Sequence, residues 1–298
     1  GIPVPNGDEW TWDDFFDIAK QLTIFDENGK TVRWGGIHWQ RGEFFIYDIA
    51  LTLGWDIVTE DGRPNINDPK LKKALEYYIR STQIDKSGRT DADIASDNIA
   101  NSYIFTGERA SMCIMGINNA VWMDWYVENG YMSKELDDKD VIKLTFMPRA
   151  DKNSLRRPQP ATIGGICVTK ISKYPREAFE FAMYTCTDMV MVGAKYMHRY
   201  PAWTGADINQ LIEDFRWQTD TEGKLFLGKD RPELYKASLE KDVKFIFWPY
   251  RNNYAYSPQL LDELKKELSL LIAGEKPIDR VLEDAQAAAE KVYEKFKN

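Results

Sequence analysis

The chain has few of the side chains on which metal and acid–base chemistry most often depend. Only two of its 298 residues are histidines, His38 and His198. This excludes histidine–glutamate zinc motifs, cysteine–histidine zinc clusters and most histidine-based catalytic sites within the chain. Carboxylate pairs that hydrolyse glycosides stay open, because 47 acidic residues always permit some pair and no pattern selects one. The sequence therefore favours binding over turnover, with no metal, cofactor or catalytic residue expected.

Cysteine is also scarce. Cys113, Cys167 and Cys186 are the three present, without CxxC spacing. An odd number so spaced argues against a disulfide framework. Cys113 and Cys167 stand in apolar, strand-like runs, which predicts that both thiols are buried small hydrophobic groups.

Excess positive charge and long apolar runs are missing too. The net charge is −8, which disfavours the phosphate attraction that nucleic-acid binding requires. The longest apolar runs, such as 44–47, are far too short to cross a bilayer. No signal peptide or lipid-attachment cysteine stands at the start, and Gly1 in place of methionine predicts a processed or cut end.

Aromatic residues, by contrast, are abundant: 10 Trp, 15 Tyr and 14 Phe. Many stand beside polar residues, as in 38–40, 122–125 and 248–250. Flat rings with a polar tip suit ligands that have apolar faces and hydroxyl edges, as sugars do. The alternative interpretation is that most of these rings belong to the core.

Caps and hydrophobic periodicity predict a chain built mostly of helices. Thr11 and Asp14 have the spacing of a capping box, and one helix is expected over 94–105, ending at Gly107. Further helix starts are predicted at Asp68-Pro69, Pro175, Thr187-Asp188, Ser257-Pro258 and Pro277. Strands are predicted at 32–37, 110–115, 141–147 and 165–169. A solvated acidic loop is expected around Asp85, Asp91, Asp93 and Asp97, whose spacing does not fit a calcium loop.

Four different short motifs are spread along the chain. They are Trp-Thr-Trp-Asp-Asp-Phe at 10–15, Phe-Thr-Gly-Glu-Arg-Ala-Ser-Met at 105–112, Gly-Gly-Ile-Cys-Val-Thr-Lys-Ile-Ser-Lys at 164–173 and Gly-Glu-Lys-Pro-Ile-Asp at 274–279. In this order and at these separations they resemble the family-1 extracellular solute-binding proteins of ABC sugar transporters, which include maltose-binding protein. The resemblance covers nearly the whole chain.

The resemblance implies an α/β, helix-rich, two-lobe periplasmic-binding-protein-like fold of type II. In that family the segment matched by 1–12 lies well inside the chain. It therefore also implies that an N-terminal portion with most of lobe one is absent from these 298 residues. Residues 1–165 and 199–298 are expected to form lobe two, and 166–198 to be a segment contributed to lobe one.

The function implied is that of the substrate-binding component of an ABC transporter, not an enzyme. It would capture a carbohydrate, expected to be an oligosaccharide, in an aromatic-lined cleft by hinge closure, and deliver it to permease subunits. The expected location is extracellular, either as a Gram-positive cell-surface lipoprotein held through an N-terminal lipid anchor or in the periplasm. The alternative is a carbohydrate-active enzyme, a glycoside hydrolase or lyase with an aromatic cleft.

The resemblance also carries over a set of ligand-binding positions. Trp39 follows the predicted strand 32–37 at a turn that faces the cleft in relatives. Asn118 stands where relatives often place a stacking Trp, and Trp122, one turn on, could replace that ring. Gly164 and Gly165 would let backbone amides approach a ligand closely, and Arg199 with Tyr254 or Tyr256 would supply donors and rings. A hinge, packing or surface role is the alternative for each.

Overall fold

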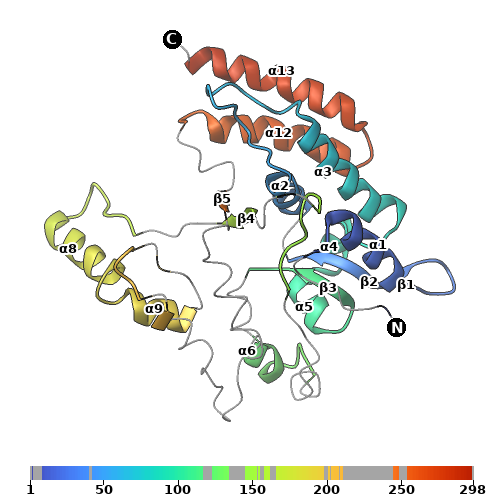
Figure 1. The fold of residues 1–298 in the computed structure, drawn as a ribbon, viewed down its shortest axis with the longest axis horizontal. Coiled ribbons are helices and arrows are strands. Elements are labelled where there is room, and N and C mark those ends of the chain that lie inside the picture. Colours follow the sequence, from blue (N-terminus) through green and yellow to red (C-terminus); the bar gives the residue numbers. More distant parts are fainter. Residues whose placement is uncertain are drawn as a thin grey trace. The chain divides into compact units, whose positions relative to one another are not determined.

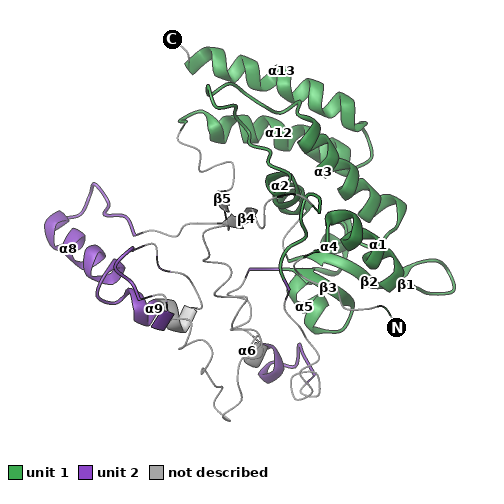
Figure 2. Ribbon diagram, viewed as in Figure 1, with its two compact units in different colours: residues 1–114, 146–161, 241–298 green, residues 115–145, 162–240 purple. Residues whose placement is uncertain are grey.

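The computed structural model describes residues 2, 9–39, 42–116, 123–133, 145–152, 154, 158–161, 166–197, 201, 203–207, 209–210, 244–247 and 254–296. The chain divides into two compact units (Figure 2). Unit one comprises residues 1–114, 146–161 and 241–298, and unit two comprises residues 115–145 and 162–240.

Unit one begins with helix α1 (Trp12–Leu22), which starts at the predicted capping box. The Asp14 carboxylate accepts a hydrogen bond from the Thr11 backbone N–H at 2.8 Å, and the Asp14 N–H donates to the Thr11 hydroxyl at 3.3 Å. The helix packs very closely on a strand. A Cβ added at Gly35 would lie 1.6 Å from the Ala19 carbonyl oxygen, so only glycine fits there.

That strand belongs to a three-stranded sheet with the order β1-β2-β3. Strand β1 (Ile24–Phe25) is antiparallel to β2 (Thr31–His38), and β2 is parallel to β3 (Ala110–Ile114). The strands predicted at 32–37 and 110–115 are therefore confirmed. In the parallel pair His38 lies opposite Ile114, so the carboxyl ends of β2 and β3 meet at one edge of the sheet.

A long helical crossover joins β2 to β3. Its elements are α2 (Gly42–Thr52), α3 (Pro69–Ile79), the π-helical turn η1 (Arg80–Ile84), α4 (Asp91–Asp97) and α5 (Asn101–Thr106). Helix α3 starts at the predicted Asp68 cap. The prediction of one helix over 94–105 is wrong. Asn98 adopts a left-handed conformation with φ 54°, which Asn tolerates and which ends α4 before α5 begins.

The main core of unit one is formed by the crossover helices, α1 and the two C-terminal helices. Helices α12 (Ser257–Ile272) and α13 (Ile278–Phe296) start where predicted and pack together, and α13 also packs against α3 (Figure 1). Aromatic rings supply much of this core: Trp10, Trp12, Phe15, Phe16, Phe45, Tyr47, Trp55, Tyr77 and Tyr78. For these rings the core interpretation is confirmed, so aromatic content alone says less about sugar than the sequence suggested.

Two short strands also belong to unit one and were not predicted. Strand β4 (Pro158–Ala161) pairs in parallel with β5 (Lys244–Phe247), with Pro158 opposite Lys244. Their pairing partners are far apart in the chain, so neither segment has a local neighbour to mark it as a strand.

In unit two the structure describes helices α6 (Met123–Glu128), α8 (Pro175–Cys186) and α9 (Val190–Met197). Helix α8 begins at Pro175 as predicted. The strand expected at 165–169 is wrong over 166–169, which have no strand partner among the described residues, and Cys167 is exposed rather than buried. Of the strand expected at 141–147, residues 145–147 are not a strand and 141–144 lie outside the described residues.

None of the helices that the structure describes is both long enough and apolar enough to cross a membrane.

Candidate functional site

The carboxyl ends of β2 and β3 form the edge at which a predicted ligand residue stands. Trp39 directly follows β2, is partly buried, and donates its backbone N–H to the Ile114 carbonyl oxygen at 2.9 Å. In open α/β sheets, ligands bind outside the carboxyl ends of the strands. We call His38, Trp39 and Ile114 the β2–β3 edge.

The buried His38 ties this edge to α2. Its Nε2 lies 3.0 Å from Asp48 Oδ2, and its ring stacks on Phe45 with centroids 5.6 Å apart and planes 13° apart. The Trp39 ring is the outer neighbour, 6.4 Å away. This histidine therefore has a structural role, in a pair that fixes the end of β2 against the first helix of the crossover.

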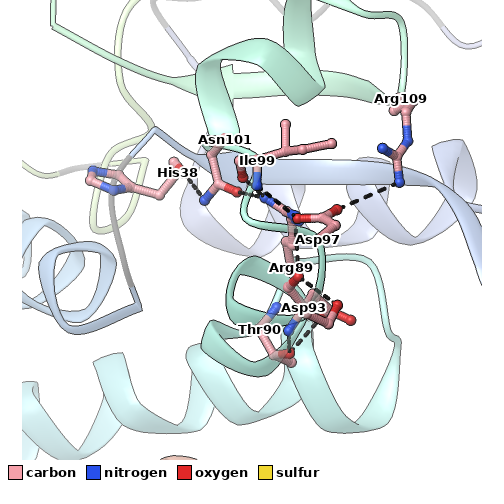
Figure 3. A network of polar contacts seen from close by, with 9 residues as sticks. His38, Arg89, Thr90, Asp93, Asp97, Ile99, Asn101 and Arg109 are labelled. Carbon is pink, nitrogen blue, oxygen red and sulfur yellow. Dashed lines mark hydrogen bonds and ion pairs between the residues drawn. The ribbon is translucent and has the colours of Figure 1, made fainter.

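The buried Arg89 connects the segment around α4 to the β2–β3 edge (Figure 3). The side chain of Arg89 is fully buried. One terminal nitrogen donates to the Ile99 carbonyl oxygen at 2.6 Å and to Asn101 Oδ1 at 2.8 Å. The amide of Asn101 in turn donates to the His38 carbonyl oxygen at 2.7 Å. Arg89 is thus linked to the β2–β3 edge through a single side chain.

The same arginine pairs with Asp97, whose Oδ1 also accepts the Ile99 N–H at 3.0 Å (Figure 3). Burial acts to raise the pKa of Asp97. The Ile99 hydrogen bond and the Arg89 and Arg109 guanidinium groups outweigh it and hold that pKa below its ordinary value. The carboxylate therefore stays ionised, which keeps the buried arginine paired.

The prediction of a solvated acidic loop is wrong, because the carboxylates of Asp85, Asp91, Asp93 and Asp97 each have a structural partner. Asp93 completes a capping box with Thr90 at the start of α4, and Asp91 accepts the Gly42 N–H at 3.0 Å. Asp85 is buried and pairs with Lys20 at 2.9 Å and Arg80 at 3.0 Å. Across the described part of the chain, no group of acidic, histidine or cysteine side chains could hold a metal ion.

The ring of Trp34 contacts two arginine side chains, those of Arg89 and Arg109. The guanidinium carbons of Arg89 and Arg109 each lie 5.5 Å from its ring centroid, a distance at which cation–π attraction operates. Trp34 is buried in a small cluster with Ile37, Ile104 and Ala110. Its ring supports the Arg89 network, whereas the Trp39 ring stands at the edge.

Tyr254 and Tyr256, also predicted for the ligand site, lie elsewhere in unit one. Their rings are 5.4 Å apart, and Tyr256 also contacts Tyr293 and Phe296 near the end of α13. The Tyr256 hydroxyl donates to the Gly62 carbonyl oxygen. Trp39 has no ring contact or hydrogen bond with either tyrosine. The structure therefore does not bring these tyrosines together with Trp39.

The other predicted positions, Asn118, Trp122, Gly164, Gly165 and Arg199, lie outside the described residues. Sequence reasoning missed Arg89 and Asn101. The only local signal nearby is the Thr90 capping box, which marks a helix start but gives no reason to connect the preceding arginine with β2.

An open groove also runs between α12 and α13, with a volume of about 610 Å³. Its lining is mostly charged and polar: Gln259, Asp262, Glu263, Lys266, Val292, Lys295 and Phe296. Trp39, Tyr254 and Tyr256, the predicted ligand residues that the structure describes, do not line this groove.

Comparison with known proteins gives a family and a fold. A family model described as bacterial extracellular solute-binding protein matches residues 5–221. An ABC substrate-binding protein from Listeria monocytogenes, solved with cycloalternan, has 18% identity and a TM-score of 0.69, over 99% of this chain and 66% of that one. A sugar transporter protein from Rhizobium etli has 16% identity and a TM-score of 0.67, over 97% and 66%.

A maltose/maltodextrin-binding domain from Bdellovibrio bacteriovorus, bound to maltotriose, has 18% identity and a TM-score of 0.60, over 100% and 68%. These likenesses confirm the predicted two-lobe periplasmic-binding-protein fold. The chain spans about two thirds of the length of these structures, 66% of the first two. A search of curated proteins returned no match.

Proposed function

The chain belongs to the bacterial extracellular solute-binding proteins, and from that membership we propose that it captures a carbohydrate for an ABC transporter. The observation that carries this proposal is the placement of Trp39. An aromatic ring that is only partly buried stands at the carboxyl edge of a parallel strand pair, where α/β folds bind ligands. A flat indole face there suits the apolar face of a sugar ring.

The proposed ligand is an oligosaccharide. In support, two of the similar structures hold cycloalternan and maltotriose. A third, from Agrobacterium vitis, holds D-mannitol, so smaller polyols belong in any test. Binding would proceed by hinge closure, with the ligand favouring the closed form through contacts to both lobes. Asn118, Trp122, Gly164, Gly165, Arg199, Tyr254 and Tyr256 remain the proposed further ligand residues.

The proposed partners are the permease subunits of the transporter, and the proposed location is the cell surface, through an N-terminal lipid anchor, or the periplasm. The family description, extracellular, supports this placement.

A role in binding rather than turnover is supported by the carboxylates near the edge. Asp48 faces His38, and Asp97 holds Arg89 and Arg109. Both are engaged in structural pairs, which leaves them poorly suited to protonate or attack a glycosidic bond.

The ligand class can be tested by a thermal-shift screen over sugars, amino acids and divalent metals. We expect maltotriose or a related oligosaccharide to raise the melting temperature, because a ligand at about a hundred times its dissociation constant stabilises a protein by about 2.7 kcal/mol. D-mannitol, leucine and zinc chloride serve as the comparison ligands. A shift with the amino acid and none with any sugar would sink the proposal.

Prolonged incubation with the same oligosaccharides separates binding from catalysis. Unchanged sugar, analysed by chromatography, is expected. Accumulation of shorter products would favour the glycoside hydrolase or lyase interpretation instead.

We also propose that 166–198 belongs to a different lobe from 1–165 and 199–298. Helix α8 supports this assignment, because within it only Ala182 is buried. Phe179 and Met183, four residues apart on one face, are 58% and 46% exposed. An apolar helix face of this kind fits a segment that packs on another surface.

From this exposed face we expect the 298-residue chain to self-associate. Light scattering at rising concentration should show a mass above the monomer's, since exposed apolar patches favour association. The double variant Phe179→Glu, Met183→Glu should be monomeric. A matched control, Arg176→Glu with Glu180→Arg, reverses a surface ion pair of 3.0 Å on the same helix and should still associate. A wild-type chain that stays monomeric contradicts the expectation.

A further inference from the structure

The peptide bond between His38 and Trp39 is held from both sides. Its carbonyl oxygen accepts the Asn101 amide at 2.7 Å, and its N–H donates to the Ile114 carbonyl oxygen at 2.9 Å. The first bond comes from a side chain on α5 and the second from the neighbouring strand. Rotation of this peptide would break both bonds, so the backbone that carries the Trp39 ring is fixed before any ligand arrives.

The direction of the Asn101 bond is set by Arg89 (Figure 3). A guanidinium group has only donors, so the oxygen of the Asn101 amide must face it, at 2.8 Å. The amide nitrogen then faces the His38 carbonyl. The reverse orientation would oppose two donors on one side and two acceptors on the other. A buried amide between these neighbours therefore has one acceptable orientation.

Arg89 is itself fixed within its loop. Its donors reach the carbonyl oxygens of Ile99 at 2.6 Å and Asp93 at 3.3 Å, and Asp97 pairs with it. None of its hydrogen bonds, ion pairs or ring contacts is to Trp39, so the polar connection passes through Asn101.

We infer that Asn101, oriented by Arg89, is a positioning residue that presets Trp39 for ligand binding. The role in binding rests on the proposed function, whereas the restraint on the Trp39 backbone does not. A backbone that is ordered before binding spares the ligand the cost of ordering it, which raises affinity.

The test uses the full 298-residue chain with ¹⁵N-labelled tryptophan and follows backbone amide hydrogen exchange by NMR without ligand. Asn101→Asp keeps the shape and the pairing with Arg89 but replaces the donor to His38 with an acceptor. We expect the Trp39 amide to exchange about tenfold faster, since a buried carbonyl has lost its partner. The Trp34 amide, which donates to the Arg109 carbonyl oxygen at 2.9 Å in the same sheet, is the internal reference and should change far less.

A matched control separates positioning from a general loss of stability. Thr106→Val removes a buried hydroxyl on the same helix, whose hydrogen bonds go to the Ser102 and Tyr103 carbonyl oxygens of α5, at 3.1 and 3.4 Å, and not to β2. It should lower the melting temperature without selectively accelerating Trp39. As a second variant, Arg89→Lys should accelerate Trp39 by a smaller factor, because an ammonium group cannot hold Asn101 and Asp97 in the same fork geometry.

Calorimetry with maltotriose then reads the effect on binding. We expect affinity about tenfold weaker in Asn101→Asp and unchanged in Thr106→Val. A wild-type chain that binds no sugar counts against the proposed function, while the exchange measurement still decides the restraint. Trp39 exchange that is unchanged in both Asn101→Asp and Arg89→Lys overturns the inference, whatever sugar binds.

Discussion

Trp39→Ala should weaken sugar binding by about tenfold or more, because loss of a well-placed aromatic contact typically costs about 2 kcal/mol or more. The ring is partly buried at the β2–β3 edge, and its backbone bond to Ile114 does not depend on the side chain. The free energy of unfolding should therefore change much less than the affinity. Calorimetric titration with maltotriose and urea denaturation give the two quantities.

Trp39→Phe is the matched variant for this experiment. It keeps a flat apolar ring next to His38, so part of the stacking face remains and the loss of affinity should be smaller than in Trp39→Ala. Unaltered affinity in both variants, with a marked loss of stability, would mean that Trp39 is a packing residue.

Trp12→Ala should have the opposite pattern, with a loss of about 3–5 kcal/mol in the free energy of unfolding. The Trp12 side chain is fully buried, and its ring centroid lies 5.6 Å from that of Phe15 and 6.1 Å from that of Phe45. Its indole N–H donates to the Thr52 hydroxyl at 2.6 Å. That hydroxyl also donates to the Ile49 carbonyl oxygen, so it keeps a partner and the cavity dominates the cost.

The comparison for Trp12 is an exposed tryptophan. Trp203 is 43% exposed, and Trp203→Ala should change stability by about 0.5 kcal/mol or less. Urea denaturation of both variants gives the difference, and sugar affinity of the folded Trp12→Ala protein should remain close to that of the wild type. A loss below about 1 kcal/mol for Trp12→Ala would show that this core collapses around the missing ring.

Several elements could be predicted from the sequence because their causes lie within a few residues. The Thr11 capping box joins residues three apart, and the prolines at the starts of α3, α8 and α12 act on the first helical turn. The order of four short motifs gave the family, which the match over residues 5–221 confirms.

Other elements could not be predicted because burial removes the pattern on which prediction depends. Helix α2 is buried over nearly its whole length, from Phe45 to Thr52, so it has no polar face and no helical stripe to detect. The break at Asn98 depends on a single left-handed residue within an otherwise continuous helical pattern. The exposed position of Cys167 depends on which segments pair, and an apolar run does not specify its partner.

The sequence by itself determined the starts of α1, α3, α8, α12 and α13, the strands at 32–37 and 110–115, and the family. Only the tertiary structure decided that most described tryptophans are core, and that Arg89 and Asn101 hold the edge at which Trp39 stands. The physical reason is the separation along the chain of the residues that each interaction joins. Capping acts between neighbours in the chain, whereas the Asn101 bond to His38 joins residues 63 positions apart, which are neighbours only because β2 and α5 pack together in the fold.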